Sequence, residues 1–244
     1  MLADERPVQL LLNGEVVTTL LASNGHLEEL CLGHFATEHG LSLEPGCWTV
    51  VHDRMNDVER LDLVVDGQEP LPQREGVVTS SCGACNADSL SDMLSIMSPP
   101  VLATESIDLD RVLEHLTAMH LRQPLFEKTG GVHAAGLLFA GPGTTVVVRE
   151  DIGRHNAVDK VFGSVMLEHE DMGRPVALLL SGRCGWDIVA KAARLGVPVV
   201  ASIGAASQLA AEVARMNGIS LVTFGRTGTA TVIGAIQGRF QAKD

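Results

Sequence analysis

The chain has 244 residues, a formal net charge of -12 and 3% aromatic residues, with no Tyr at all. Its length suits one large domain or two small ones, with enough apolar residues to fold without disulfides. An extended nucleic-acid surface is excluded, because it needs basic patches and aromatic stacking platforms. The sequence also lacks a secretory start and any apolar run of about 18 residues, so we expect a cytoplasmic protein without membrane contact.

The first third predicts a small, antiparallel α+β unit. A strand-rich run over 8–21 is interrupted at Asn13-Gly14, a pair that strongly favours a hairpin turn. Apolar spacing over 27–35 indicates a short helix. Two further apolar runs within 47–65 predict a second hairpin.

Residues 79–105 lose this periodicity and predict an interdomain loop that carries Cys82 and Cys85. Beyond it, Asp108 can cap a helix, and strands then alternate with helices up to a last strand at 219–224. Near-continuous apolar strands such as 176–180 are typical of a parallel sheet covered on both faces. The predicted class is α/β, with an N-terminal α+β subdomain at 1–78, the loop at 79–105 and an α/β domain at 106–244.

An odd number of cysteines in a reducing compartment indicates free thiols. Two of them lie among apolar neighbours and are expected in the core, and only one pair is close in sequence. The five are Cys31 and Cys47, expected in the core, then the close pair Cys82 and Cys85, and finally Cys184.

The Cys82-Gly83-Ala84-Cys85 segment has several interpretations. Structural zinc needs about four ligands, and no second pair is present, so no metal ligands are assigned. A redox dithiol usually begins a helix, whereas this context is a polar loop. A persulfide carrier needs an exposed thiolate with small neighbours, which this loop offers. Spacing alone leaves these readings open, together with that of two unremarkable cysteines.

Glycine-rich segments follow three of the predicted strands, where the ends of a parallel sheet gather ligands beside helix N-termini. Arg183 and Arg226 could each hold an oxyanion there, which predicts a nucleotide or another phosphorylated ligand. The alternative is that short loops need glycine and hydroxyl caps in any case. The segments are Ser181-Gly182-Arg183, Gly204-Ala205-Ala206-Ser207 and Gly225-Arg226-Thr227-Gly228-Thr229.

The run from Glu150 to Lys160 is dense in ionisable groups around Gly153. Such a run is either a ligand site or the salt-bridged start of a helix, and we favour a site.

Four segments together resemble the FdhD family of formate dehydrogenase accessory sulfurtransferases, and the resemblance extends over nearly the whole chain. They are Ser81-Cys82-Gly83-Ala84-Cys85, the stretch from Phe126 to Ala135, the run from Glu150 to Lys160, and Ser181-Gly182-Arg183.

The resemblance implies a sulfurtransferase with a cytidine deaminase-like, three-layer C-terminal domain. Cys82 would accept persulfide sulfur from a cysteine desulfurase, and Cys85 would assist or relay it. The acceptor would be the bis(guanine dinucleotide) molybdenum cofactor required for formate dehydrogenase activity. Because Ala135 replaces the glutamate of the deaminases, no deamination is expected.

The resemblance implies that the molybdenum cofactor binds as the acceptor of the sulfur and not as a permanent group. GDP could mimic it. It also allows a homodimer. The alternatives are a non-catalytic cofactor chaperone and a dithiol oxidoreductase. The implied cofactor-binding residues are His133, Arg154, His155, Ser181, Gly182, Arg183, Phe224, Gly225, Arg226, Thr227, Gly228 and Thr229.

Overall fold

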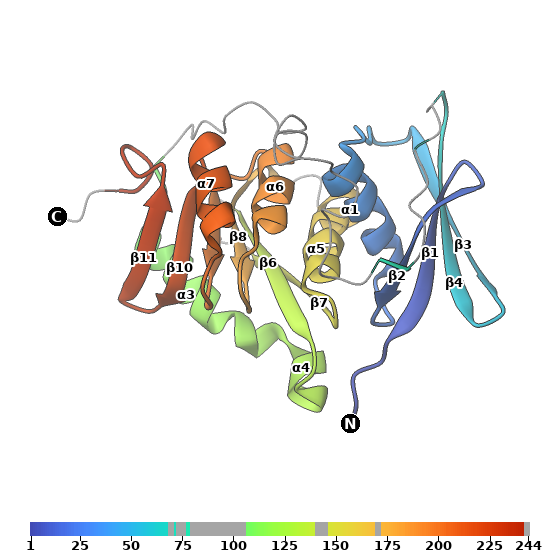
Figure 1. Cartoon of the computed structure of the whole chain (residues 1–244), viewed down its shortest axis with the longest axis horizontal. Coiled ribbons are helices and arrows are strands. Elements are labelled where there is room, and N and C mark those ends of the chain that lie inside the picture. Colours follow the sequence, from blue (N-terminus) through green and yellow to red (C-terminus); the bar gives the residue numbers. More distant parts are fainter. Residues whose placement is uncertain (68–70, 72–76, 79–105, 140–145, 169–171, 242–244) are drawn as a thin grey trace. The chain divides into compact units, whose positions relative to one another are not determined.

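The computed structural model describes residues 1–67, 71, 77–78, 106–139, 146–168 and 172–241 (Figure 1). The chain divides into two compact units. The first unit comprises residues 1–83, 125–133 and 149–170, and the second comprises 84–124, 134–148 and 171–244. The predicted loop at 79–105 lies outside the described residues.

The first unit is built on a five-stranded sheet in the order β3-β4-β1-β2-β5. Both predicted hairpins are confirmed, but the expectation of a wholly antiparallel sheet is wrong, because β1 and β4 run parallel with Leu10 opposite Leu61. A helix between the hairpins returns the chain across the sheet and so produces this pairing. The strands are β1 (Arg6–Leu12), β2 (Glu15–Ala22), β3 (Trp48–Met55), β4 (Val58–Val65) and β5 (Val77–Val78).

The first hairpin turn explains why the sequence signal at Asn13-Gly14 is reliable. Both residues have positive φ, 50° and 86°, as a two-residue hairpin turn requires. The Asn13 amide also donates to the Val65 carbonyl at 3.0 Å and accepts from the Val65 N–H at 2.9 Å. The turn of one hairpin therefore fixes the end of the other.

Two helices of the first unit, α1 (Leu27–His39) and α5 (Arg154–Glu168), pack backbone to backbone. A Cβ at Gly33 would lie 1.8 Å from the Asp159 carbonyl oxygen, and one at Gly163 would lie 1.9 Å from that of Glu29. Only glycine permits this approach. The close packing assigns α5 to the first unit, so the observed division differs from the predicted boundary at residue 78.

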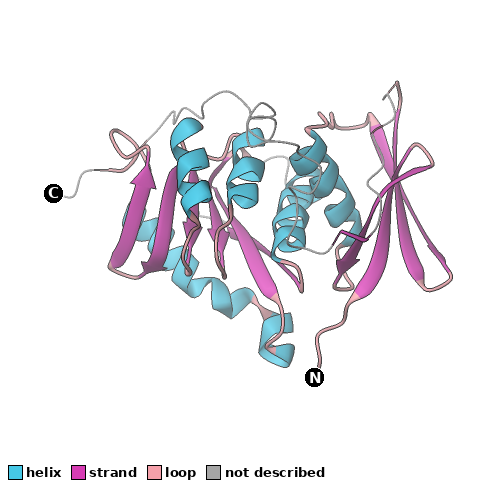
Figure 2. Cartoon of the chain, viewed as in Figure 1, coloured by secondary structure: helices cyan, strands magenta, loops and turns pink. Residues whose placement is uncertain are grey.

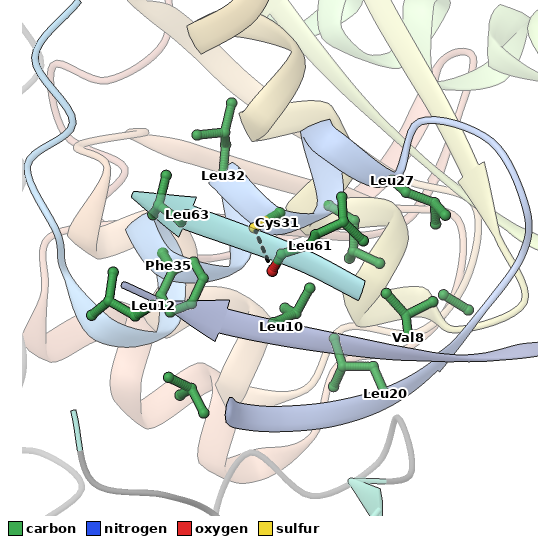
Figure 3. Close-up of a cluster of buried hydrophobic side chains, with 13 residues drawn as sticks. Val8, Leu10, Leu12, Leu20, Leu27, Cys31, Leu32, Phe35, Leu61 and Leu63 are labelled. Carbon is green, nitrogen blue, oxygen red and sulfur yellow. Dashed lines mark hydrogen bonds between the residues drawn. The ribbon is translucent and has the colours of Figure 1, made fainter. Parts of the chain in front are cut away.

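The core of the first unit lies between α1 and the sheet, as Figure 3 shows. Leu10, Leu61 and Leu63 are fully buried against Leu30 and Phe35 of the helix. α1 is covered on nearly all sides, because the sheet packs on one side and α5 on another. This explains why the helix shows little amphipathic periodicity in its sequence.

The second unit holds most of a six-stranded sheet in the order β11-β10-β9-β8-β6-β7. The central strands β8, β9 and β10 are parallel, whereas β6 and β11 pair antiparallel to β8 and β10. The strands are β6 (His133–Phe139), β7 (Val146–Asp151, whose residues 149–151 belong to the first unit), β8 (Pro175–Leu180), β9 (Val199–Ser202), β10 (Ser220–Arg226) and β11 (Thr229–Gly234).

Helices cover both faces of this sheet (Figure 2). One face packs against α3, which begins after Asp108, whose carboxylate accepts from the Arg111 N–H at 3.2 Å as predicted. α6 and α7 lie side by side on the other face (Figure 1). The three layers confirm the α/β class. The helices are α3 (Leu109–Ala118), the 3-10 turn η1 (Met119–Arg122), α4 (Pro124–Thr129), α6 (Trp186–Arg194) and α7 (Gln208–Met216).

Two local expectations are wrong. The segment 225–229 does not lead into a helix, because β10 turns back into β11 through Thr227 and Gly228. Cys47 is exposed rather than in the core, because it precedes the edge strand β3, whereas Cys31 is buried as expected. No helix among the described residues has the length and apolar character needed to span a membrane.

Candidate functional site

The carboxyl ends of β8, β9 and β10 are joined by backbone hydrogen bonds into a continuous edge. We call this the strand-end rim and define it as residues 181–185, 204–207 and 224–229. The Gly204 N–H donates to the Gly182 carbonyl at 3.1 Å, and the Phe224 N–H donates to the Gly204 carbonyl at 3.1 Å. All three predicted glycine-rich segments thus meet in one place.

The rim is held rigidly because its backbones are in direct contact. A Cβ at Gly204 would lie 2.9 Å from the Gly182 carbonyl oxygen, so this position requires glycine. The Cys184 N–H donates to the Ala205 carbonyl at 3.0 Å, and the Ser207 N–H donates to the Cys184 carbonyl at 3.1 Å. These bonds fix the two loops to each other before any ligand arrives.

Ser181 anchors the first rim loop to strand β6. Its N–H donates to the Ala134 carbonyl at 3.0 Å, and its hydroxyl oxygen accepts from the Ala134 N–H at 2.8 Å. The hydroxyl therefore has a structural task in addition to the predicted ligand contact. His133, the residue before Ala134, is exposed at the start of β6.

Phe224 is the most unusual residue of the rim. Its φ is +51°, a left-handed conformation that non-glycine residues seldom adopt, and its side chain is 56% exposed. The next residue packs closely on α3, because a Cβ at Gly225 would lie 2.6 Å from Leu116 Cδ2 and the leucine side chain would have to shift. A strained backbone that presents an aromatic ring to solvent is typical of a binding site.

Two arginines give the rim its charge. Arg183 and Arg226 are both exposed, and neither forms an ion pair within the described part of the chain. Residues 171–244 contain eight Lys or Arg and four Asp or Glu, although the whole chain has a net charge of -12. This charge asymmetry, which the motifs alone do not reveal, indicates an anionic ligand. With exposed hydroxyls at Thr227 and Thr229, the rim can bind phosphate groups beside a stacked base.

The ionisable run from Glu150 to Lys160 has a largely structural role in the first unit. The buried Lys160 ammonium lies 2.7 Å from the buried Asp151 carboxylate and donates to the Ser23 carbonyl at 2.9 Å. Asp151 also accepts from the N–H groups of Ser23 and Gly153 at 3.0 and 2.8 Å. We call Ser23, Asp151, Gly153, Asn156 and Lys160 the buried polar cluster.

Two further charges of this region are also occupied within the first unit. The Glu150 carboxylate accepts from the N–H groups of Leu125 and Phe126, at 2.8 and 2.7 Å, and so caps α4. The Asp159 carboxylate accepts from the Thr37 hydroxyl at 2.6 Å. Two of the residues predicted to bind the cofactor lie in this run. Arg154 is half-buried and His155 is buried, and their role stays a prediction.

Comparison with known proteins identifies the family. A family model described as the FdhD/NarQ family matches residues 3–237. The chain belongs to the FdhD/NarQ family.

Relatives in this family are similar along most of their length. A protein of Anaeromyxobacter dehalogenans named sulfur carrier protein FdhD is 36% identical over 92% of this chain and 83% of its own. One of the same name from Nocardia farcinica is 32% identical over 95% and 85%. A crystal structure from Desulfotalea psychrophila, of a protein with a proposed formate dehydrogenase accessory role, has a TM-score of 0.74 at 24% identity, over 98% of this chain and 90% of that one. It shows the same fold.

The cysteines of this FdhD/NarQ member include two that the structure does not describe and three that it does. Cys82 and Cys85 lie outside the described residues, so their role stays a prediction. Cys31 is fully buried, where desolvation raises the pKa of its thiol far above the usual range, and its Sγ contacts the Leu61 carbonyl at 3.9 Å (Figure 3). A thiol held neutral in this way is unreactive. Cys184 is buried within the rim.

Proposed function

We propose that the chain is a sulfur carrier protein for formate dehydrogenase. It accepts persulfide sulfur from a cysteine desulfurase on Cys82 and transfers it to the bis(guanine dinucleotide) molybdenum cofactor, its substrate. The strand-end rim is the observation that carries this proposal, because it combines exposed arginines, glycine backbones and an exposed aromatic ring on one edge. The names of the relatives support sulfur transfer.

The rim fits a guanine nucleotide by its chemistry. Arg183 and Arg226 can each form charge-assisted hydrogen bonds with phosphate oxygens. The exposed face of Phe224 can stack on a base, a contact that is worth about 1–3 kcal/mol. We assign Ser181, Gly182 and Thr227–Thr229 to the same ligand, with GDP as its mimic. His133, Arg154 and His155 belong to the first unit, and their cofactor contact stays a separate prediction.

The two cysteines carry out the sulfur transfer in two steps. The Cys82 thiolate attacks the outer sulfur of the desulfurase persulfide, and the desulfurase cysteine leaves as a thiolate. The Cys85 thiolate then attacks Cys82 Sγ, which forms the Cys82–Cys85 disulfide and releases the outer sulfur as sulfide to molybdenum. The two electrons come from Cys85, and a cellular dithiol afterwards reduces the disulfide.

Intact-mass spectrometry tests the acceptance step. After incubation with a cysteine desulfurase and cysteine, we expect the mass of one additional sulfur atom on the wild type and none on Cys82→Ala. Cys31→Ala is the matched control, because this buried thiol should not compete and the adduct should persist. Because Cys85 can release the sulfur from Cys82, absence of the adduct from both the wild type and Cys85→Ala would rule out a carrier role.

A cofactor chaperone without sulfur chemistry is the competing function, and one variant separates the two. If the protein transfers sulfur, Cys82→Ala should bind GDP as the wild type does and yet fail to support formate dehydrogenase maturation. If maturation remains intact in Cys82→Ala, the thiol is dispensable and the chaperone function is the correct one.

A further inference from the structure

The net charge of the chain is confined to the first unit. That unit holds 20 of the 30 acidic residues and 8 of the 18 basic ones, so it accounts for the whole net charge of -12, whereas the second unit holds ten of each. The proposed cofactor is a polyanion, which the charge of the first unit repels. A partner that binds to the first unit is therefore expected to present a basic surface.

Strand β3 is a free edge of the first unit's sheet (Figure 1), and no strand in the described part of the chain pairs with its outer side. Its residue Val50 lies opposite Leu63, whose carbonyl accepts from the Asn13 N–H on the side of β1. The backbone groups of Val50 therefore point away from β4, and because strands alternate, so do those of His52 and Arg54. These groups are available to an added strand.

A cavity of about 310 Å³ lies beside this edge, within the first unit. His52 lies opposite Leu61, a core residue under α1, so the His52 side chain is on the same face of the sheet as α1. A side chain that an added strand places beside His52 on this face would point into the cavity. The lining includes His52 of β3, His26 and Glu28 at the start of α1, and Leu167 near the end of α5.

The polar groups of this cavity suit a cation. The Glu59 carboxylate lies 3.0 Å from His52 Nε2, and the Glu29 carboxylate lies 3.1 Å from His26 Nδ1. A neutral imidazole that donates through one ring nitrogen accepts at the other, so each histidine keeps an acceptor nitrogen. Glu28 is exposed and forms no ion pair with the described residues. Lysine and arginine side chains have only donors and match these groups.

We propose that a basic, extended segment of the cysteine desulfurase adds as a strand to the outer edge of β3 and places a lysine or arginine side chain in this cavity. The inference rests on the proposed sulfur carrier function, for which it names the docking site of the sulfur donor. Main-chain hydrogen bonds with Val50, His52 and Arg54 would supply affinity, and the cavity would select the side chain.

The sulfur donor is the partner that has to reach Cys82. At the other edge of the same sheet, about 19 Å from β3, β5 ends at Val78, four residues before Cys82 in the sequence. Four residues of chain extend at most about 14 Å. Both lengths are comparable with the width of an ordinary protein–protein interface, so a donor bound at β3 can reach the thiol.

Calorimetric titration with the desulfurase of the sulfur-loading test examines the cavity. Glu28→Lys reverses the exposed carboxylate, so we expect about tenfold weaker binding. Glu15→Lys is the matched control, because it makes the same change of charge at the exposed start of β2, outside the cavity lining, and should bind within about twofold of the wild type. Equal losses from both variants would indicate general electrostatic attraction and overturn the docking site.

Arg54→Pro examines the added strand. Proline removes the outward N–H of residue 54, although the loss of a positive charge by itself favours a basic partner. Arg54→Ala loses the same charge and keeps the N–H, so it is the matched control. We expect Arg54→Pro to bind about fivefold more weakly than Arg54→Ala, the effect of one hydrogen bond. Equal binding of the two variants overturns strand addition.

The rate of sulfur loading separates this inference from the carrier function. In a Cys85→Ala background, Glu28→Lys should form the Cys82 adduct about tenfold more slowly at low desulfurase concentration. At saturating concentration the two rates should agree, which also shows that the variant is folded. If loading at low concentration is unaffected by Glu28→Lys, the docking site is wrong and the carrier function stands. If neither the wild type nor Cys85→Ala forms an adduct, the carrier function fails, and the docking site with it.

Discussion

The buried polar cluster of the first unit and the strand-end rim of the second unit use charge in opposite ways. Asp151 and Lys160 are fully buried and form an ion pair, whereas Arg183 and Arg226 are exposed and form no ion pair with the described residues. A buried charge is stable only with a partner inside the protein, while an exposed one can exchange water for a ligand. Charge density along a sequence therefore does not by itself locate a binding site.

The glycines of the two regions also differ in their roles. Gly33 and Gly163 allow two helix backbones to touch within the core, so their role is packing. Gly204 and Gly225 allow the rim loops to close over each other and over α3, and this closure leaves Phe224 at the surface. In both regions glycine permits a close approach between segments, but only at the rim does this approach lie beside an accessible surface.

Removing one partner of the buried ion pair should have the largest effect. Lys160→Met leaves the Asp151 carboxylate buried without its cation, and we expect a loss of about 3–5 kcal/mol in the free energy of unfolding. Denaturant unfolding measures this loss. Arg183→Met is the control and should change the free energy of unfolding by less than about 0.5 kcal/mol. If Lys160→Met and Arg183→Met destabilise the protein equally, the contrast between the cluster and the rim fails.

Much of this fold follows from the sequence, and the exceptions have physical causes. Asn13-Gly14 and Asp108 specify a turn and a helix cap through local geometry, so both predictions are confirmed. The parallel pairing of β1 with β4 depends on contacts between distant residues, which local periodicity does not encode. The hairpin after Phe224 was missed because a glycine-rich turn looks the same before a helix and before a strand.

Only part of the candidate site could be predicted from the sequence. Glycine and arginine at the strand ends are visible in the sequence, and the structure brings residues 182, 204 and 224 together. The interpretation of the run from Glu150 to Lys160 was less successful, because burial decides whether a charge is structural, and burial results from tertiary packing. Exposure of Phe224 at positive φ had no signal in its own residue type.

Substitution of Phe224 separates strain from function. Phe224→Gly removes the strain of the left-handed backbone and should raise the free energy of unfolding by about 1 kcal/mol. The same change removes the stacking surface and should weaken GDP binding by about 1–3 kcal/mol. Calorimetric titration and denaturant unfolding measure the two effects. Phe126→Ala, at another exposed aromatic position, should leave GDP affinity unchanged. Equal GDP affinity in Phe224→Gly and wild type would exclude stacking.

Each rim arginine should contribute less to GDP binding than Phe224 does. Arg183→Met and Arg226→Met remove one charge-assisted contact with phosphate apiece, so we expect about tenfold weaker GDP binding from each, with little change in stability. Arg174→Met is a close control, because Arg174 is also exposed and precedes β8 at the opposite end of the strand from Arg183. Equal losses from all three variants would indicate general electrostatic attraction rather than a site at the rim.

The smallest expected effect is a pH-dependent contribution of Glu29 to the stability of the first unit. Glu29 is buried, which raises the pKa of its carboxyl, but hydrogen bonds from His26 and Arg149 and the Arg149 charge outweigh this and lower the pKa below 4.5. Arg149 lies 2.5 and 2.7 Å from the two carboxylate oxygens. Because the pKa is lower in the folded state, the ionised form stabilises the protein above the unfolded pKa, and this contribution is lost as the pH falls through the folded value.

Glu29→Gln isolates this contribution. At pH 7 we expect the variant to be less stable than the wild type by about 1 kcal/mol, the usual worth of such hydrogen bonds. The difference should shrink as the pH falls below 4.5, because the wild-type carboxyl then becomes protonated and neutral like the amide. Denaturant unfolding of both proteins across this range measures it, with Glu28→Gln as the exposed neighbouring control. A difference that is constant with pH would mean that the loss comes from altered packing and not from the Glu29 charge.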